Sequence, residues 1–379
     1  MRLLKTLLII MTALNMGSCI KSELPNSEAD IIEIKFPEGI RTDAPVNYNN
    51  TYNSEIKAYP LLVEVKDTCK LDKLCPEFEL TPGAKIEPES GSRQNFNTPV
   101  RYKVISEDGN WHRDYLIMVY HPVNKEIPSH YDFEHAKLNK NYHVVYQKEA
   151  GRRDLYFASG NAGFAITAGK TTPAEKYPTT LAAPGFESDS CLCLTTRYTG
   201  SWGAMAGKPI AAGNLFMGDF DGSHAMGDAL KCTRFGVPVI HKPLKISGMY
   251  KYKVGTGNSY KFKEGEKDDF DIYAVLFEGS VEKPYLDGHL PIEGFRDSCI
   301  VAVARVADDI KKETDEWTKF EMVFDYPAGI NKFNQAKLEA RRYSMAFVMS
   351  SSKGGASFKG TVGSCLKVDD VEIKFEGIE

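Results

Sequence analysis

The chain has 379 residues, of which 42% are hydrophobic, 26% charged and 11% aromatic. This composition leaves room for two or three packed domains and excludes collagen-like and wholly disordered chains. The 47 lysines and arginines are nearly balanced by 51 aspartates and glutamates, which gives a net charge of −4. Because the sequence has no basic block of the kind that follows a phosphate backbone, a nucleic acid is not expected as a partner.

The amino terminus has the features of an export signal. Arg2 and Lys5 precede an apolar run at residues 7–14, which is too short to span a bilayer. Small residues and then Cys19 follow this run, and the pattern resembles the lipobox of bacterial lipoproteins. The resemblance implies cleavage before Cys19 and acylation of its thiol and new amino group, which would anchor the chain to a membrane.

By this interpretation residues 1–18 are the signal peptide and residues 19–27 are a tether. Lys21 and Glu23 resemble a weak form of the lysine-plus-acid signal that sends Bacteroidetes lipoproteins to the cell surface. We therefore predict a lipid-anchored outer-membrane protein, exposed at the cell surface. The alternative is an ordinary cleaved secretory peptide with a chance cysteine.

Seven cysteines remain when Cys19 is set aside, so at least one of them is a free thiol. Cys69 and Cys75 flank a short polar loop, where a disulfide and two thiols are equally compatible with the sequence. Cys191 and Cys193 are two residues apart in a predicted strand, so their side chains point the same way and are poorly placed for a mutual bridge. They are expected to be buried thiols or cross-strand partners.

Residues 28–121 are predicted to form a small antiparallel β-sandwich. Short runs alternate apolar and polar residues with the period of a half-buried strand, and turn residues separate the runs. The expected inward positions are Ile32, Ile34, Phe36, Leu61, Val63, Val65, Val100, Tyr102, Val104, Tyr115, Ile117 and Val119. The segments 78–84 and 102–111 resemble an Ig-like module of Bacteroidetes lipoproteins, which implies a spacer role. Trp111 lies near a predicted strand start, so a core position is expected for it rather than a ligand platform. Residues 122–129, with two prolines, are predicted to be a linker.

Residues 130–379 are predicted to form one larger β-sandwich. The expected strands are Cys191–Thr196, Leu244–Val254, Phe270–Phe277, Cys299–Val306, Phe320–Asp325, Ser344–Ser350 and Leu366–Phe375. The only convincing helical pattern is Asn331–Arg342. In the last strand the apolar parity changes at Asp369-Asp370, which predicts a β-bulge with one aspartate pointing inward.

Several motifs in this second region resemble the putative carbohydrate metabolism domain of Bacteroidetes lipoproteins. They are Tyr131–Glu134, Ala211–Phe216 with Gly218 and Phe220, Gly248–Tyr252, and the glycine-rich stretch from Phe347 to Phe375 that contains Gly363–Val371. The resemblance implies a jelly-roll fold and a role in glycan acquisition, together with other outer-membrane glycan-uptake proteins. The name of the family implies no particular chemistry.

A structural calcium ion is one expectation for this domain. A jelly roll with acids in its first and last strands resembles carbohydrate-binding modules in which such carboxylates share calcium, an ion that prefers oxygen ligands. The expected ligands are Glu134 and Asp370, with Asp369 or Asp132 as the third. The alternative is that these acids bond the bulge without a metal.

Sugar binding calls for aromatic faces that pack on the C–H surfaces of pyranose rings, together with a few polar groups that recognise hydroxyls. The candidates for these roles are Tyr198, Trp202, Tyr250, Tyr252, Tyr260 and Arg234. Tyr198 and Trp202 fall in a glycine-rich stretch that is predicted to be a loop. For each aromatic residue, the alternative is a half-buried position in a sheet.

The function predicted from the sequence is glycan binding through the jelly roll, with the Ig-like spacer lifting it off the membrane. A jelly-roll glycoside hydrolase or polysaccharide lyase is the first alternative, and it would need two facing carboxylates. The available acids include residues 268, 269 and 271, Asp219, Asp221 and Glu278. The second alternative is an adhesin-like protein that contacts other surface proteins.

Overall fold

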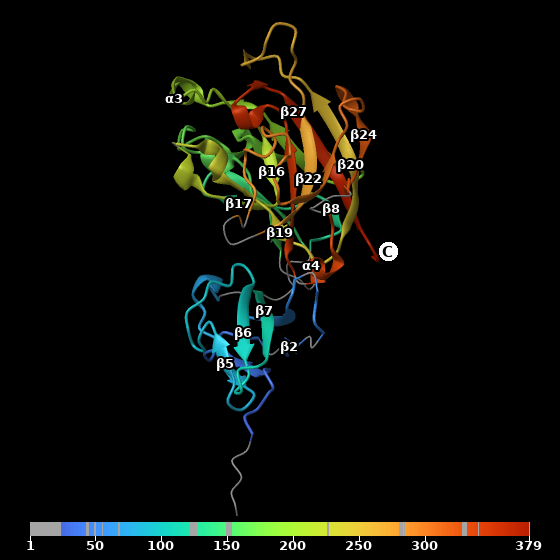
Figure 1. Cartoon of the computed structure of the whole chain (residues 1–379). Coiled ribbons are helices and arrows are strands. Elements are labelled where there is room, and N and C mark those ends of the chain that lie inside the picture. Colours follow the sequence, from blue (N-terminus) through green and yellow to red (C-terminus); the bar gives the residue numbers. More distant parts are fainter. Residues whose placement is uncertain are drawn as a thin grey trace, which may run out of the picture.

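The computed structural model describes residues 24–42, 45–48, 51–54, 56–66, 69–120, 127–148, 154–225, 227–279, 283, 285–327, 332–339 and 341–378. The predicted signal peptide, the lipidation site Cys19 and most of the linker lie outside these residues. Within them, no helix is long and apolar enough to cross a membrane. The described chain is all-β, as the sequence predicted, and its strands form a small Ig-like sandwich and a larger jelly-roll sandwich (Figure 1).

The small sandwich contains a two-stranded sheet, ordered β1-β4, and a five-stranded sheet, ordered β2-β3-β7-β6-β5. Its strands are β1 (Ile31–Lys35), β2 (Asn47–Tyr48), β3 (Tyr59–Glu64), β4 (Glu77–Leu80), β5 (Lys85–Glu87), β6 (Val100–Ile105) and β7 (His112–Tyr120). All pairs are antiparallel except β3 and β7, which run parallel. One short 3-10 helix, η1 (Leu71–Lys73), lies between β3 and β4.

The core of the small sandwich follows the predicted alternation closely. Three of the four expected sets of inward residues are buried or half-buried, and Val63, Tyr102 and Ile117 are fully buried. The exception is β1, where Ile31 and Ile34 are buried while Ile32 is 52% exposed. An irregularity in the pairing of β1 with β4 shifts the register at this point, which turns Ile32 outward.

Trp111 was expected in the core and is instead 56% exposed. It lies at the turn between β6 and β7, where its backbone N–H donates to the Ser106 hydroxyl at 3.1 Å. A side chain at the tip of a hairpin has no second sheet to cover it. The turn therefore leaves Trp111 in solvent and outside the core of the small sandwich.

The jelly-roll sandwich is built from two facing sheets. The first is ordered β12-β13-β27-β20-β24, with β8 paired to β27, and the second is ordered β16-β25-β22-β23, with β19 paired to β25. The first sheet contains β8 (His130–Tyr131), β12 (Thr179–Ala182), β13 (Cys191–Thr195), β20 (Pro243–Lys253), β24 (Thr314–Val323) and β27 (Cys365–Phe375). The second contains β16 (Asn214–Phe216), β19 (Val237–Pro238), β22 (Asp271–Glu278), β23 (Ile300–Arg305) and β25 (Tyr343–Ser350).

Each of the seven strands predicted in this region is present. Six of them have ends within about two residues of the prediction, whereas β24 begins earlier, at Thr314. The predicted helix is represented by the shorter α4 (Gln335–Glu339). The core between the two sheets contains buried side chains from both, among them Tyr250, Ile272 and Val368.

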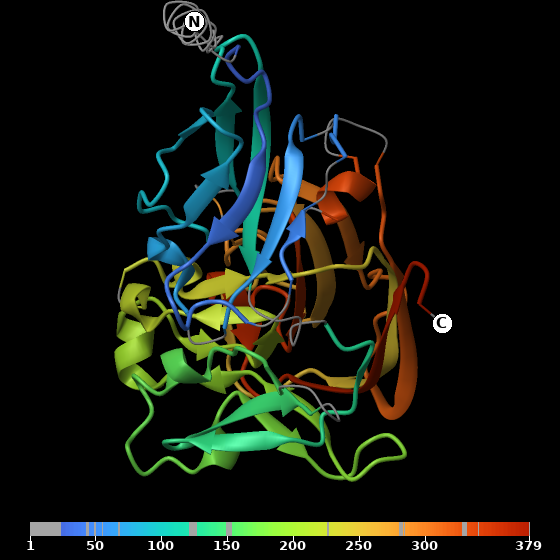
Figure 2. The ribbon, with the colours of Figure 1, turned by 90° about the horizontal axis from the view of Figure 1, so that it is seen from below.

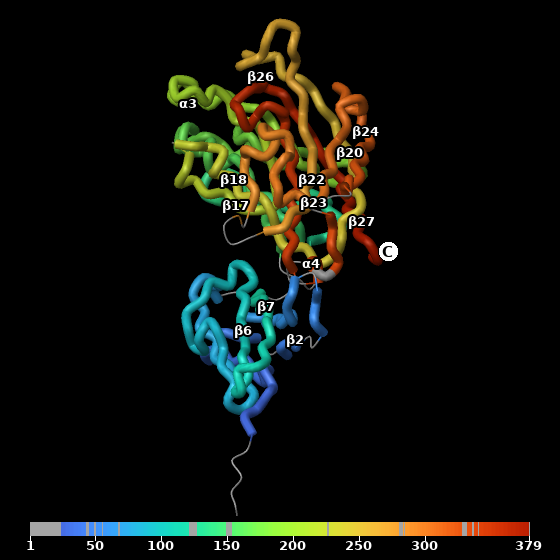
Figure 3. The backbone as a smooth tube through the Cα atoms, viewed as in Figure 1, coloured from blue at the N-terminus to red at the C-terminus, as the bar shows by residue number. Residues whose placement is uncertain are grey.

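Small additions surround the sandwich. They are the strands β9 (Ala136–Asn139), β10 (Tyr142–Gln147), β11 (Leu155–Tyr156), β14 (Arg197–Tyr198), β15 (Ile210–Ala211), β17 (Gly218–Phe220), β18 (Thr233–Phe235), β21 (Ser259–Tyr260) and β26 (Gly360–Thr361), and the short helices α2 (Asn161–Phe164), η2 (Ala174–Lys176), α3 (Gly200–Met205), η3 (Gly222–His224), η4 (Ala229–Cys232) and η5 (Gly355–Ser357). Figure 2 shows the hairpin β9–β10, in teal, along one side of the large sandwich. In Figure 3 the additions around α3, β17 and β18 lie on the side away from β20 and β24.

The two sandwiches follow one another along the long axis of the molecule (Figure 3). One contact between them joins Tyr120, the last residue of β7, to Arg341, which follows α4. The Arg341 guanidinium lies over the ring of Tyr120, at 4.1 Å from its centre. A cation over an aromatic face is attracted by the ring quadrupole, so this pair helps to hold the two sandwiches together.

Candidate functional site

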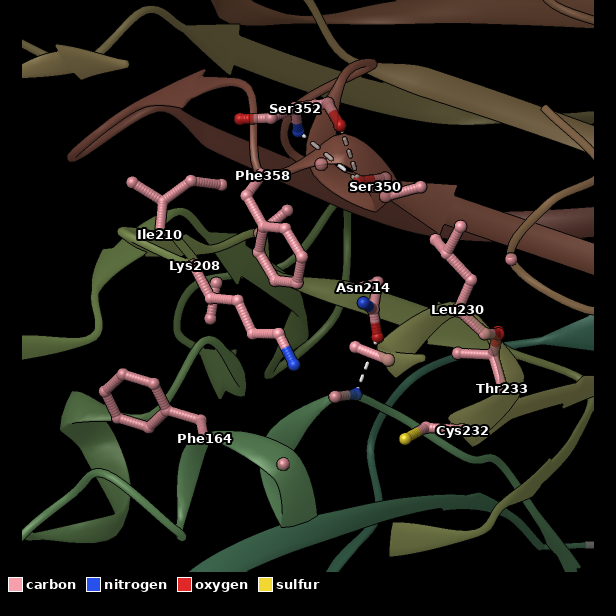
Figure 4. A pocket seen from close by; sticks show the side chains of 18 of the residues that line it. Phe164, Lys208, Ile210, Asn214, Leu230, Cys232, Thr233, Ser350, Ser352 and Phe358 are labelled. Atoms are coloured by element: carbon pink, nitrogen blue, oxygen red, sulfur yellow. Dashed lines mark hydrogen bonds between the residues drawn. The ribbon is translucent and has the colours of Figure 1, made fainter. Parts of the chain in front are cut away.

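A pocket of about 510 Å³ opens on the outer face of the second sheet of the jelly roll, and we call it the central pocket (Figure 4). Phe216, Tyr273 and Val348 form its floor, and they belong to a buried cluster separate from the core between the sheets. Its walls come from α2, α3, the segment of η3 and η4, and residues 350–358. This volume is within the usual range for pockets that bind small molecules.

The lining of the central pocket is rich in aromatic side chains. Phe164 comes from α2, Trp202 from α3 and Phe358 from the segment after η5. Trp202 is 84% exposed, so its indole is at the mouth of the pocket with most of its surface in solvent. Figure 4 shows the rings of Phe164 and Phe358 on the same side of the cavity. Such rings can pack against the apolar faces of a sugar.

Two nitrogen donors project into this apolar surrounding. The Asn214 side-chain oxygen accepts a hydrogen bond from the Gly160 N–H at 2.7 Å, which leaves its amide nitrogen directed at the cavity (Figure 4). Lys208 also points into the cavity, and its ammonium donates to the carbonyl oxygen of Ala225 at 2.6 Å. An apolar pocket with a few directed polar groups is the usual construction of a ligand site.

A buried asparagine fixes α2 against the sandwich. Asn161 is fully buried, donates to the carbonyls of His143 and Thr179, and accepts from the Thr179 N–H at 3.0 Å. The Thr179 hydroxyl in turn donates to the carbonyl of Asn214 at 2.7 Å. This chain of hydrogen bonds joins α2, β12 and β16, so the wall that carries Phe164 and the donor Asn214 are held together.

A buried acid fixes the wall formed by residues 350–364 in a similar way. Asp268 is 5% exposed and accepts hydrogen bonds from the hydroxyls of Ser352 and Ser364 and from the Thr361 N–H, at 2.7 to 2.8 Å. Burial raises the pKa of the Asp268 carboxyl, and these hydrogen bonds oppose that rise. The carboxylate therefore ties the segment that carries Phe358 to the edge of β22.

A network of ion pairs reaches the pocket, where its members Asp271 and Lys353 line the cavity, and we call this part the polar end. Asp271 is 2% exposed and accepts two hydrogen bonds from the Arg305 guanidinium, at 2.7 and 2.8 Å. The Lys311 ammonium is buried 3.8 Å from Asp271 and 2.7 Å from Asp308. Hydrogen bonds from Lys311 and Lys353 hold the pKa of the Asp308 carboxyl well below its usual range.

The structure places three of the six predicted sugar-binding residues in or beside the pocket. Trp202 lines it, on the helix α3 rather than in the loop that was predicted. The rings of Tyr198 and Tyr260 are stacked with centres 6.2 Å apart. Tyr198 pairs with Ile210, a lining residue, so this stacked pair lies next to the pocket without lining it.

The other three candidates lie outside the pocket lining, and for Tyr250 and Tyr252 the structure corrects the sequence prediction. Tyr250 and Tyr252 share one face of β20, as expected, but that face is the core, where they are 0% and 2% exposed. The Tyr250 hydroxyl donates to the Ile310 carbonyl at 3.1 Å. Arg234 is paired with Asp221 and lies over the ring of Tyr285, outside the pocket lining.

The predicted bulge in β27 is confirmed. The pairing of β27 with β20 shifts register beside Asp369, which is 1% exposed, and Asp370 has a φ of +49°. Asp369 accepts hydrogen bonds from the Phe186 N–H at 2.6 Å and the Ser188 hydroxyl at 2.8 Å. The irregular backbone thus buries one aspartate, as the change of parity indicated.

The three predicted calcium ligands do not converge. The Glu134 carboxylate accepts from the backbone and hydroxyl of Ser190, and Asp370 is paired with His130 at 2.9 Å on the surface. In the part of the chain that the structure describes, no three acids, histidines or cysteines are grouped to hold a metal ion. Calcium at this bulge therefore stays a prediction, and the hydrogen bonds account for Glu134 and Asp369.

The buried Asp369 leads to a prediction about pH. Burial raises the pKa of its carboxyl, with the negative charge of Glu134 as a smaller contribution in the same direction. A raised pKa adds stability at low pH that is lost as the pH rises through the raised value. We therefore expect wild type to gain stability relative to Asp369→Asn as the pH falls from neutrality towards the ordinary aspartate pKa of about 3.9, measured by urea unfolding. Parallel pH profiles for the two proteins would contradict this.

The structure has free thiols at Cys75, Cys191, Cys193, Cys232, Cys299 and Cys365. Cys191 is buried, and Cys193 has its sulfur 3.7 Å from that of Cys365 on the neighbouring strand β27. The expectation of buried thiols or cross-strand partners therefore describes both residues. Burial raises the pKa of the Cys191 thiol to about 12, whereas the hydrogen bond with Cys365 lowers the pKa of Cys193.

None of the acids considered for hydrolysis forms a facing pair in the pocket. Asp271 is the only acid among the described residues that line it, and its charge is matched by Arg305. Asp219 is largely exposed, and Glu278 is paired with Lys337 and Arg342. A glycosidase mechanism needs a second carboxylate across the scissile bond, and the lining does not supply it.

Sequence reasoning missed Phe164, Lys208, Asn214 and Phe358. Asn214 and Phe358 fell within motifs that were noted only for their family resemblance, and nothing in the local pattern of Phe164 and Lys208 distinguishes them. These residues come from segments far apart in the sequence, and the sheet pairing brings them together. Only Trp202, the exposed aromatic residue in a glycine-rich stretch, carried a local signal.

The fold and the pocket define a jelly-roll domain with a ligand-sized, aromatic cavity, preceded by an Ig-like sandwich. The family model named putative carbohydrate metabolism domain matches residues 132–374, and the chain belongs to this family. The model named SGBP, N-terminal, matches residues 46–119, within the small sandwich. Together the two matches give the chain a carbohydrate-related role.

Two solved structures are similar over long stretches. A putative glycoside hydrolase from Bacteroides thetaiotaomicron is 38% identical, with a TM-score of 0.63, over 94% of this chain and 100% of that one. A putative glycoside hydrolase from Bacteroides vulgatus is 40% identical, with a TM-score of 0.61, over 66% of this chain and 100% of that one. A search of curated proteins found no match.

Proposed function

We propose that this protein binds glycans in the central pocket, and that an acylated Cys19 holds it in the outer membrane at the cell surface. The observation that carries the binding role is the lining itself. It combines the aromatic faces of Trp202, Phe164 and Phe358 with directed donors, and its one acid is neutralised by Arg305. The match to the SGBP N-terminal model supports a surface or secreted location.

Hydrolysis is the second candidate function. The two similar solved structures, each named a putative glycoside hydrolase, favour it. Against it stands the absence of a second acid among the described residues that line the pocket. In either role, other outer-membrane proteins of glycan uptake would receive the bound chain, and display of many copies would strengthen shallow contacts.

A single experiment separates these functions. The protein lacking residues 1–19 is incubated with a panel of host and plant polysaccharides, and retained protein and released oligosaccharide are both measured. Retention without release supports glycan binding. Release supports hydrolysis, and no retention on any polysaccharide would overturn both in favour of a protein-contact role.

Trp202→Ala tests the pocket directly. We expect retention on a binding polysaccharide to fall about 2- to 13-fold, since a stacked aromatic contact contributes about 0.5–1.5 kcal/mol. The melting temperature should not change, because the indole is 84% exposed. Trp111→Ala, which removes an exposed tryptophan from the small sandwich, is the matched control and should leave retention unchanged.

A further inference from the structure

The charges at the polar end of the central pocket cancel one another. Three acids, Asp269, Asp271 and Asp308, contact three bases, and every member has an opposite charge within 4.0 Å. The bases in this network are Arg305, Lys311 and Lys353. The network is therefore neutral as a unit and leaves no charge for a ligand to balance.

Lys208 is different because its contacts are uncharged. Its ammonium donates to the carbonyl oxygens of Ala225 at 2.6 Å and Gly227 at 3.4 Å, and lies 5.9 Å from the centre of the Phe358 ring. Among the described residues it forms no ion pair with a carboxylate, although its side chain lines the pocket. An ammonium has three donors, and the carbonyl contacts leave one for a ligand.

The acids nearest to this wall already have basic partners. Asp221 is paired with Arg234, and Asp228 is 3.5 Å from His289 and 3.9 Å from Lys231. Neither acid is within ion-pair distance of Lys208. The lining around Lys208 is mainly apolar, and a charge in such a place is stabilised strongly by an opposite charge.

A second donor faces the same cavity. The amide nitrogen of Asn214 is directed at the cavity because its oxygen is taken by Gly160, and Figure 4 shows both Asn214 and Lys208 pointing inward. A charged and a neutral donor in one cavity suit the oxygens of an anionic group. The ring of Phe358, whose centre is 5.9 Å from the Lys208 ammonium, offers a surface on which the apolar face of a sugar can pack.

We propose that the central pocket selects acidic saccharides, with the anionic substituent held by Lys208 and Asn214. The substituent is the carboxylate of a uronic acid or a sulfate ester, since both present anionic oxygens to the two donors. This inference rests on the proposed glycan-binding function and adds the class of sugar. In this proposal Lys208 determines the preference for acidic over neutral saccharides.

Binding to matched saccharide pairs tests the proposal. Isothermal calorimetry compares polygalacturonate oligosaccharides with their methyl esters, and chondroitin sulfate oligosaccharides with their desulfated form. We expect at least one acidic member to bind about 10-fold more tightly than its partner without that charge, with affinity falling as salt rises. The pair that shows the difference identifies carboxylate or sulfate as the recognised group.

Lys208→Met removes the charge while keeping an apolar stem against Phe358. We expect the acidic saccharide to bind about 10-fold more weakly to this variant. Its neutral counterpart should lose less affinity, because it loses a hydrogen bond to Lys208 but no charge pair. Lys261→Met is the matched control, because Lys261 also lies over the Phe358 ring, at 5.3 Å, and donates to the Ser357 carbonyl, yet does not line the pocket. Melting temperatures of both variants check that they are folded.

The outcomes separate this inference from the function on which it rests. Equal binding of acidic and neutral saccharides, or a Lys208→Met variant that binds the acidic form normally, overturns the acidic selectivity while glycan binding stands. Failure to bind any saccharide of the polysaccharide panel overturns both. If Lys261→Met lowers the affinity for the acidic saccharide as much as Lys208→Met does, the effect comes from the surface charge around Phe358. That result would also overturn the role of Lys208.

Discussion

Replacing Asp271 with alanine is expected to lower the free energy of unfolding by about 3–5 kcal/mol. Removing one member of a buried ion pair leaves the other charge without compensation, and that is the costly step. Here Arg305 would lose both of its hydrogen bonds to the carboxylate, and the buried Lys311 would lose a neighbouring charge at 3.8 Å. Urea unfolding of wild type and variant gives the difference directly.

Two further variants test the physical reason for that loss. Asp271→Asn keeps the shape and one acceptor, so it should fall between wild type and Asp271→Ala. Asp315→Ala is the control for an exposed pair, because Asp315 is 72% exposed and contacts Lys253 at 2.7 Å. Such pairs contribute at most about 1 kcal/mol. Equal losses for Asp271→Ala and Asp315→Ala would mean that the buried network is not a stabilising unit.

The strands were predictable because a period of two survives in a half-buried strand. A bulge, where the backbone departs from regular pairing, can be predicted only if the apolar residues change from one alternating set of positions to the other. This change was visible at Asp369, where apolar residues on both sides changed phase, and the bulge is present there. At Ile32 the parity was misleading, because Ile31 and Ile32 are both apolar and the alternation that continues to Phe36 placed Ile32 inward. The pairing with β4 shifts between Ile31 and Glu33, so Ile31 is buried instead.

The errors in the predicted site arise because the sequence does not show which face of a strand is covered by a second sheet. Tyr250 and Tyr252 were correctly placed on one face, but sequence alone does not say whether a tyrosine face meets solvent or a second sheet. β20 is paired on both sides, with β27 and β24, and its tyrosine face is covered by the second sheet. Trp202 was predictable because a tryptophan in a glycine-rich stretch has little core to join.

The pocket itself could not be predicted, because its parts depend on long-range hydrogen bonds. Asn161 joins α2 to β12, and Asp268 joins residues 352–364 to the start of β22, with partners 18 and 84–96 residues away. Both residues are polar and buried, which composition and periodicity do not reveal. Their hydrogen bonds position the segments that carry Phe164 and Phe358, so the geometry of the pocket rests on side chains that do not line it.

Asp268→Ala should therefore affect both stability and binding. The variant would leave the hydroxyls of Ser352 and Ser364 and the Thr361 N–H without their acceptor, and each unsatisfied buried group costs about 1–3 kcal/mol. We expect a loss of about 3 kcal/mol in the free energy of unfolding. Because the same bonds hold the wall that carries Phe358, glycan retention should fall as well.

Hydrogen exchange locates the effect within the chain. Amides of residues 351–364 should exchange faster in Asp268→Ala, while those of the small sandwich keep their protection. Glu266→Ala is the matched control, since Glu266 is exposed and pairs with Lys359 of the same segment at 2.5 Å. It should change neither exchange nor retention. Faster exchange spread evenly over both sandwiches would show instead that Asp268 stabilises the chain globally and has no special hold on the wall of the pocket.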